Sequence, residues 1–127
     1  IDTEGWFHTG DLGYFDEDGF LYIVDRVKDM VITGGENVYP AEIEAVLLSH
    51  PAVEEAGVCG QADAHWGQVP IAFVHLHQGS TISANELHVY AAQRLARYKQ
   101  PYVIHIVGPL PRNSAGKLLR RELHLTR

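Results

Sequence analysis

Hydrophobic and polar residues follow one another along the second half of the chain in a pattern that predicts three β-strands. Residues 53–59 form a largely apolar run, residues 70–77 alternate between two faces, and residues 102–107 are rich in β-branched side chains. Between the first two runs, residues 60–67 form a glycine-bounded stretch around Trp66 that we expect to be a loop. The pattern therefore predicts one small three-stranded sheet.

Two segments with helical spacing lie before and between these strands. The first is predicted to begin at Pro40, because the missing N–H of proline costs nothing at the first helical position, and to end before Pro51. Its apolar face begins at Ile43. The second segment follows the capping box at residues 83–86, and a short last helix is predicted over residues 118–123. Together these segments predict an α+β fold, a small three-stranded sheet with flanking helices.

The front of the chain has a different pattern and predicts a separate β-hairpin. Residues 16–19 combine acidic residues with a glycine, as hairpin turns do, and residues 20–24 return as a strand. A two-stranded hairpin is marginally stable alone, so we expect it to belong to something larger. The charged segment 25–29 follows the hairpin directly and is the one credible boundary in the chain.

Composition adds limits to this picture. The 127 residues, 46% hydrophobic and 20% charged, suit one domain or one small domain plus a piece of another. No apolar run approaches the ~20 residues that a membrane-spanning helix needs. The single cysteine, Cys59, fits a reducing cytosol, and the absence of an initiator methionine predicts a fragment of a longer protein.

The net charge of −6 hides a basic C-terminal part. A nucleic-acid-binding function is disfavoured, because the cations are spread over predicted helices and a loop without interleaved aromatic residues. A solvated basic helix face explains several of them equally well: Arg94, Arg97, Arg120 and Arg121.

The eight histidines do not predict a metal site. His75 and His77 lie two residues apart on a predicted strand, but two ligands without a third make a poor site, and we expect both to face solvent. No other histidine stands at ligand spacing from a partner, and Cys59 is isolated in the sequence. No metal ligand is therefore assigned.

Lys117 is the first candidate for chemistry. It follows Gly116 on a loop that we expect to be flexible, where a compact cation can reach phosphate or carboxylate oxygens. The phosphate-cradling loop of nucleotide hydrolases is excluded, because Pro111 stands where its first glycine should be and Leu118 replaces its hydroxyl residue. An ordinary exposed lysine in a turn is the alternative and, from spacing alone, the commoner case.

Three further positions allow a nucleotide-handling role. Asp11 lies on a short glycine-flanked loop, where a carboxylate can accept both hydroxyls of a ribose or merely cap the turn. Arg26 can fork to phosphate or sugar oxygens, or pair with a neighbouring aspartate. Gly34 and Gly35 permit positive φ or a close approach, as an ordinary turn also requires. From the residues alone, a fragment that binds phosphate or a nucleotide is one of several possible interpretations of this chain.

Three motifs occur in a specific order: GWFHTGD at residues 5–11, DRVKD at 25–29 running into GGENVYPAEIE at 34–44, and LPRNSAGK at 110–117. In this order they resemble the adenylate-forming superfamily, which includes acyl-CoA synthetases, adenylating domains of peptide synthetases and beetle luciferase. The resemblance covers essentially the whole chain, and the glycine segment is most similar to that of acid–CoA ligases.

A finer resemblance involves the segments LLSHPAVEEAGV at residues 47–58 and WGQVP at 66–70. These are similar to the bacterial 2-succinylbenzoate–CoA ligases of menaquinone biosynthesis. Medium- and long-chain fatty-acyl–CoA synthetases share most of these features and remain the alternative. A non-catalytic module that binds a partner or a CoA-like ligand is the alternative from another class.

The resemblance implies a cytoplasmic, AMP-forming ligase with two half-reactions. A carboxylic acid attacks the α-phosphate of ATP to give an acyl-adenylate and pyrophosphate, and the thiol of coenzyme A then displaces AMP. The implied division is a β-hairpin end of a large N-terminal adenylating domain in residues 1–25, a hinge in residues 26–29, and a C-terminal lid domain in residues 30–127.

The resemblance also implies residue roles for the first half-reaction. Asp11 is expected to bind the ribose hydroxyls with help from Arg26, and Lys117 to contact the carboxylate and phosphoryl-ribose oxygens. The large domain, which this chain is expected to lack, holds Mg²⁺ and the acid pocket. We therefore expect the chain alone to be inactive and its sequence to leave the acid unspecified.

For the second half-reaction the resemblance implies rotation of the lid about Lys28. After the rotation, Gly34 and Gly35 are expected to line the tunnel for the pantetheine arm of coenzyme A. Backbone without side chains suits a narrow path of this kind. The implied partners are the acid, ATP, coenzyme A and the chain's own large domain, with no nucleic acid and no membrane span.

Overall fold

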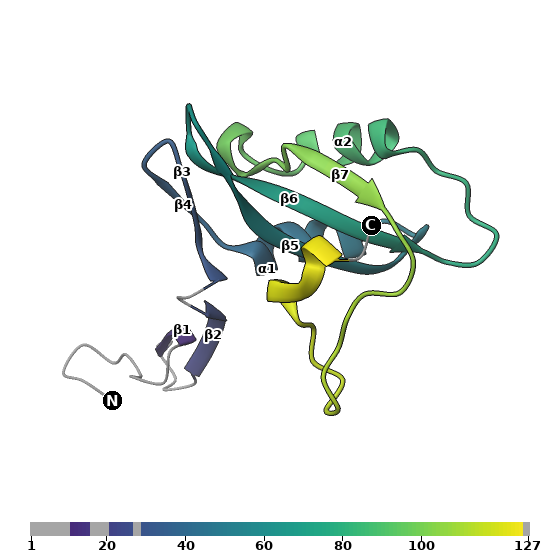
Figure 1. The fold of residues 1–127 in the computed structure, drawn as a ribbon, viewed down its shortest axis with the longest axis horizontal. Coiled ribbons are helices and arrows are strands. Elements are labelled where there is room, and N and C mark those ends of the chain that lie inside the picture. The colour runs from purple at the N-terminus through teal and green to yellow at the C-terminus, as the bar shows by residue number, and fades with distance from the viewer. Residues whose placement is uncertain (1–10, 16–20, 27–28, 126–127) are drawn as a thin grey trace.

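The computed structural model of this chain describes residues 11–15, 21–26 and 29–125 (Figure 1). The front of the chain forms a separate two-stranded sheet, in which β1 (Asp11–Phe15) pairs antiparallel with β2 (Leu21–Arg26). These are the two strands that the front of the sequence predicts. The predicted turn between them lies outside the described residues, as does Lys28.

The body of the described chain is built on a five-stranded sheet. Its strands are β3 (Val31–Thr33), β4 (Glu36–Val38), β5 (Val53–Asp63), β6 (Gly67–Leu76) and β7 (Val103–Ile106). The order is β4-β3-β6-β5, with β7 pairing parallel to β6 and the other pairs antiparallel. The three predicted strands are confirmed as β5, β6 and β7, and the short β3–β4 hairpin extends the sheet beyond them.

Both α-helices pack on the same face of this sheet. They are α1 (Pro40–Leu48) and α2 (Ala84–Ala92), and α1 begins at Pro40 as predicted. The Ser83 hydroxyl caps α2 by accepting a hydrogen bond from the N–H of Glu86 at 3.2 Å. One buried core cluster joins the helices to the sheet: Val31, Val38, Ile43, Leu47, Val53, Ala56, Val58, Ala72, Val74, Leu87, Ala91, Leu95 and Ile104.

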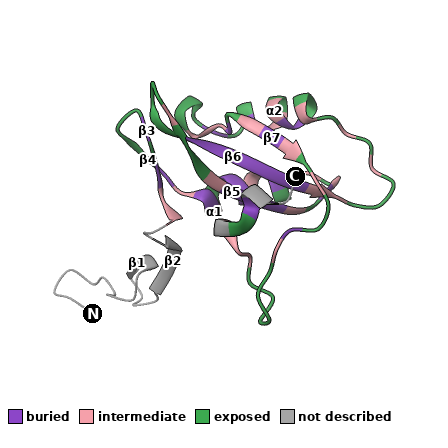
Figure 2. Ribbon diagram, in the orientation of Figure 1, coloured by how far each residue is buried: buried purple, intermediate pink, exposed green. Residues whose placement is uncertain are grey.

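The opposite face of the sheet is covered by the C-terminal part of the chain. Ile71 and Phe73 of β6 pack there against Leu110 and Leu123, and the buried strands run through the centre of the molecule in Figure 2. Gly57 makes this contact possible, because a Cβ on it would lie 2.9 Å from Cδ2 of Leu123. The predicted last helix is a 3₁₀ helix, η3 (Arg120–Leu125), which begins two residues later than expected.

Two expectations for the β5–β6 region are wrong. Residues 60–67 are not one loop, because β5 continues to Asp63 and β6 begins at Gly67, which leaves only a three-residue turn. Main-chain pairing extends the hairpin past its apolar residues, so hydrophobicity alone ended the predicted strand too early. His75 does not simply face solvent: its Nδ1 lies 3.0 Å from the carbonyl oxygen of Val107, and its Nε2 lies 3.4 Å from Glu54.

A β-bulge interrupts the start of β5. Val53 is paired with Leu76, and Glu55 is paired with His75, so Glu54 is an extra residue on this strand. Val53 and Ala56 both pack in the core under the helices, although strict alternation would place them on opposite faces. The bulge therefore turns Glu55 toward the face that carries Leu110.

Candidate functional site

Lys117 lies on a small closed hairpin, residues 112–118, which we call the lysine hairpin. Arg112 and Leu118 form an antiparallel bridge at its base. Within it, the N–H of Asn113 donates to the carbonyl of Lys117 at 2.9 Å, and the N–H of Gly116 donates to the carbonyl of Asn113 at 2.9 Å. Gly116 takes a φ of 81°, which a glycine adopts without strain.

The side chain of Asn113 closes the tip of the lysine hairpin. Its Oδ1 accepts hydrogen bonds from the N–H groups of Ala115 and Lys117, each at 2.9 Å. An asparagine that bonds its own backbone in this way forms an Asx turn, in which the side chain takes the place of a backbone carbonyl. The sequence predicts a flexible loop here, but the structure shows a turn held through its own hydrogen bonds.

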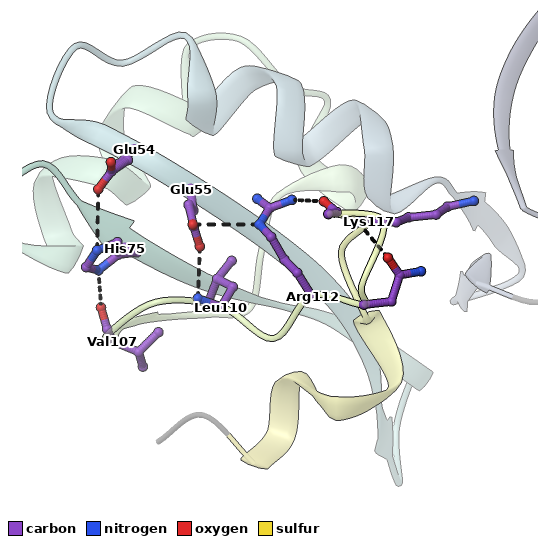
Figure 3. A network of polar contacts seen from close by, with 9 residues as sticks. Glu54, Glu55, His75, Val107, Leu110, Arg112 and Lys117 are labelled. Atoms are coloured by element: carbon purple, nitrogen blue, oxygen red, sulfur yellow. Dashed lines mark hydrogen bonds and ion pairs between the residues drawn. The ribbon is translucent and has the colours of Figure 1, made fainter.

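The Lys117 side chain is exposed and points away from the polar network beside it (Figure 3). Among the described residues, none forms an ion pair or hydrogen bond with its ammonium group. The structure thus presents a cation on a hydrogen-bonded support, where it can meet an anionic group from outside this part of the chain.

A carboxylate of β5 holds the first strand of the lysine hairpin (Figure 3). Glu55 accepts the N–H of Leu110 on Oε2 at 2.8 Å, and its Oε1 lies 3.7 Å from Nε of Arg112. Arg112 in turn donates from Nη1 to the carbonyl of Gly116 at 3.0 Å. These contacts join the sheet to the tip of the hairpin through one arginine.

A second carboxylate group holds the residues that follow the hairpin. Arg120 donates to both oxygens of Glu44, from Nη2 at 2.7 Å and from Nε at 2.9 Å, and from Nη1 to Asp29 at 3.0 Å. Glu44 also accepts the N–H of Val58 at 2.9 Å. We call Arg120, Glu44 and Asp29 the arginine clamp; it joins η3, α1 and the segment after β2.

The sequence does not predict the arginine clamp; for Arg120 it leaves a solvated basic helix face and a polyanion-binding role as alternatives. The side chain of Arg120 is only 17% exposed and that of Glu44 10%. A usable signal was present, because Glu44 follows Ile43 on the apolar face of α1, where a carboxylate requires a buried partner. Burial raises the pKa of the Cys59 thiol, and the negative charge of Glu44 raises it further.

Gly34 and Gly35 form the tip of the β3–β4 hairpin and both take positive φ, 56° and 82°. We call these two residues the glycine turn. The N–H of Gly34 donates to the carbonyl of Trp66 at 2.9 Å, and a Cβ on Gly34 would lie 3.0 Å from Cε3 of that indole. A Cβ on Gly35 would meet nothing within 4 Å. The indole is 49% exposed, so an apolar surface borders the turn.

The candidate residues are not gathered at one place. The glycine turn lies at the free end of the β3–β4 hairpin, and the lysine hairpin projects from another margin of the body (Figure 1). Asp11 and Arg26 are register partners in the β1–β2 pair, so their backbones lie opposite one another. The structure thus supports separate groups of candidates, in keeping with sites completed by another surface.

The described residues show no resident metal centre and no membrane helix. Within them, no three His, Cys, Asp or Glu side chains gather where they could hold an ion, so they do not fit a Mg²⁺ site. None of the helices described here is long and apolar enough to cross a membrane.

The family model for the AMP-binding enzyme C-terminal domain matches residues 42–117. The 2-succinylbenzoate–CoA ligase of Geobacillus kaustophilus (strain HTA426) is 62% identical over 119 residues, 94% of this chain and 24% of the relative. That of Bacillus subtilis (strain 168) is 56% identical over the same shares, 94% and 24%. The chain spans about a quarter of the length of the curated relatives it matches.

Solved structures agree with these relatives. The o-succinylbenzoate CoA synthetase of Bacillus subtilis, in complex with the acyl-adenylate intermediate, superposes with a TM-score of 0.87 at 54% identity, over 99% of this chain and 26% of that one. A fatty acyl CoA synthetase of Mycobacterium tuberculosis gives 0.81 at 47% identity, over 97% and 24%. The predicted fold is confirmed by these similarities.

Proposed function

This chain belongs to the family of AMP-binding enzyme C-terminal domains, and from that premise we propose that it is the lid of an ATP-dependent acid–CoA ligase. The ligase joins its acid to AMP with release of pyrophosphate, and then transfers the acyl group to the thiol of coenzyme A with release of AMP. Residues 30–127 form the lid, residues 26–29 the hinge, and residues 1–25 the end of a large adenylating domain. The protein works in the cytoplasm.

The acid that we propose is 2-succinylbenzoate, an intermediate of menaquinone biosynthesis. The observation that carries this proposal is the 54–62% identity to ligases of that name over 94–95% of the chain. The 47% identity to a fatty acyl CoA synthetase favours fatty acids as the second candidate. The lid does not enclose the acid in this scheme, so relatedness rather than pocket chemistry supports the choice.

For adenylation, we assign the acting cation to Lys117. Its ammonium lies on a support held by Glu55 and Arg112, and it stands clear of that network. A fixed cation beside the carboxylate and the α-phosphate stabilises the negative charge that gathers on these oxygens during attack. We assign Asp11 to the ribose hydroxyls and Arg26 to support there, in keeping with their opposed backbone positions.

For thioester formation, we assign Gly34 and Gly35 to the wall of the pantetheine path and Lys28 to the pivot. The glycine turn is narrow and bordered by the exposed indole of Trp66. Because the glycine turn and the lysine hairpin project from different margins, a rotation of the lid can present one after the other to the same large domain. Mg²⁺ belongs with the large domain in this scheme, because the described residues do not fit it.

Pyrophosphate release by the full-length protein tests the proposal. The assay supplies ATP and, separately, 2-succinylbenzoate and medium- and long-chain fatty acids, and then adds coenzyme A. We expect release with 2-succinylbenzoate far above that with any fatty acid, followed by thioester formation. Release with fatty acids alone would show that a fatty acid, rather than 2-succinylbenzoate, is the substrate, and would still support the proposed type of reaction. Release with none of them, together with coenzyme A binding, would favour a non-catalytic binding module.

The 127-residue chain alone supplies the matching control. We expect it to form no acyl-adenylate, since the ATP and acid sites lie in the large domain of the proposed enzyme. Detection of acyl-adenylate with the purified chain would contradict this division of labour.

A further inference from the structure

We propose that Glu55 is a positioning residue for Lys117, acting through Leu110 and Arg112. The inference rests on the proposed function, because it concerns the cation that we assign to adenylation. Glu55 does not touch the reacting groups in this scheme. Its carboxylate sets the position of the lysine hairpin on the sheet, and so determines where the Lys117 ammonium can reach.

The placement of Glu55 depends on the bulge in β5. The extra residue Glu54 lets Val53 and Ala56 face the helices together, while Glu55 faces the C-terminal segment. Bulges often redirect a side chain beside an active site. The polar side chain of Glu55 is 21% exposed, so the bulge directs a largely covered carboxylate at the base of the lysine hairpin.

The two carboxylate oxygens of Glu55 have different tasks. Oε2 accepts the N–H of Leu110 at 2.8 Å, which fixes the backbone where the chain enters the hairpin. Oε1 lies 3.7 Å from Nε of Arg112, a separation that is an ion pair rather than a hydrogen bond. Arg112 continues to the carbonyl of Gly116 at 3.0 Å, the residue directly before Lys117. Glu55 thus holds the entrance of the hairpin directly and reaches its tip through Arg112.

Arg112 also serves as the positive partner of the Glu55 carboxylate. A carboxylate on this face is a natural counter-ion for a lysine, yet Lys117 points away from Glu55 (Figure 3). Arg112 supplies the positive partner of Glu55, and none of the described residues pairs with the ammonium of Lys117, so this group can meet an anion from outside them. The arginine clamp holds the chain on the far side of the hairpin, so Lys117 is supported from both sides.

Two substitutions at Glu55 and one at its neighbour test this role in the full-length protein. Glu55→Ala removes both contacts, whereas Glu55→Gln keeps an acceptor for Leu110 and removes the charge that faces Arg112. Glu54→Gln is the matched control, because Glu54 pairs with His75 and does not contact the hairpin. The readouts are the kcat and KM of pyrophosphate release, the rate of thioester formation from supplied acyl-adenylate, and thermal unfolding.

We expect Glu55→Ala to lower the kcat of adenylation about ten- to a hundredfold, because small misplacements of a catalytic group have effects of that order. Thioester formation should stay within about twofold, Glu55→Gln should retain part of the lost rate, and Glu54→Gln should match the parent. An unchanged adenylation rate in Glu55→Ala would overturn the proposal. An equal fall in both half-reactions would also overturn it, since that result marks a purely structural residue.

Hydrogen exchange in the full-length protein separates this inference from the proposed function. We expect Glu55→Ala to speed exchange at the N–H of Leu110, which donates to Glu55, and Glu54→Gln to leave it unchanged. If the parent protein releases no pyrophosphate with any acid, the proposed function fails, while the exchange data still decide whether Glu55 holds the hairpin. Unchanged exchange in Glu55→Ala would overturn the positioning role by itself.

Discussion

The lysine hairpin and the glycine turn are both tight turns with positive-φ glycines, but they are held by different means. Carboxylates and an amide side chain hold the lysine hairpin: Glu55 acts at its base and Asn113 at its tip. The glycine turn is closed by the main-chain pairing of β3 with β4 and by the hydrogen bond from Gly34 to the carbonyl of Trp66, and the Trp66 ring leaves no room for a Cβ on Gly34. Polar side chains thus support the turn that presents a charge, whereas main-chain pairing beside an indole supports the turn that presents bare backbone.

The largest loss of stability is expected from Arg120→Ala, which removes the support that follows the lysine hairpin. It leaves Glu44 and Asp29 without their buried counter-charge, and breaking such a pair typically costs about 3–5 kcal/mol. Urea unfolding of the 127-residue chain measures the loss, and faster alkylation of the covered Cys59 thiol reports opening of the same face. Arg94→Ala is the control, since Arg94 is exposed over the Tyr90 ring at 3.5 Å. A loss below about 1 kcal/mol would show that the clamp is not what holds η3.

Lys117→Ala tests what the lysine hairpin presents. Removal of one preorganised charge-stabilising group typically lowers a rate by about 10²–10³, and we expect that loss in adenylation by the full-length protein. Thioester formation from supplied acyl-adenylate should persist, because the glycine turn serves that step in our scheme. Lys99→Ala is the matched lysine control for adenylation, since Lys99 pairs with Glu42 at 3.0 Å. Equal loss of both half-reactions would contradict the separation of the two turns.

Gly34→Ala and Gly35→Ala test how the indole of Trp66 shapes the glycine turn. Both place a side chain at positive φ, which costs about 1–3 kcal/mol, but only at Gly34 does the new Cβ meet the Trp66 ring. We expect Gly34→Ala to shift one of the two tryptophan indole N–H resonances and Gly35→Ala to leave both in place. Equal shifts in the two variants would mean that indole contact does not shape the glycine turn.

Asn113→Ala gives the smallest expected effect. It removes the acceptor of two exposed N–H groups, which can turn to water, so the loss should be about 0.5–1.5 kcal/mol. Exchange of the Ala115 and Lys117 amides should become faster, while the Gly34 amide keeps its protection. Asn113→Asp retains the acceptor and should behave as the parent does. A change at Gly34 would show that the two turns are coupled.

Local sequence signals predicted most of the fold. Pro40 gave the start of α1, Ser83 gave the cap of α2, and the alternation of residues 70–77 placed Ile71 and Phe73 opposite the helix face. These features depend on neighbours within a few residues, so they can be read from a single sequence. The extension of β5 to Asp63 could not, because it depends on pairing with β6.

The supports of the candidate site were the part that the sequence did not reveal. Glu44 and Arg120 lie 76 residues apart, and Glu55 and Leu110 lie 55 apart. No local pattern joins such pairs, because the folded chain alone brings them together. Lys117, Gly34 and Gly35 were named from motifs that resemble a family. Such a resemblance indicates which groups a turn exposes, but it does not indicate which distant residues stabilise the turn. The roles of these residues stay predictions, as do those of Asp11, Arg26 and Lys28.

The parallel pairing of β7 with β6 has a consequence for how the chain folds. β5 and β6 are joined by a three-residue turn and can form early, whereas β7 joins β6 only after the chain has passed through α2. We therefore expect β5–β6 to form the folding nucleus, and β7 with the C-terminal segment to be added late. In pulse-labelling of refolding chains, amides of Gly57 and Phe73, which face each other across the β5–β6 pair, should gain protection before that of Ile104. The reverse order would place nucleation at the crossover instead.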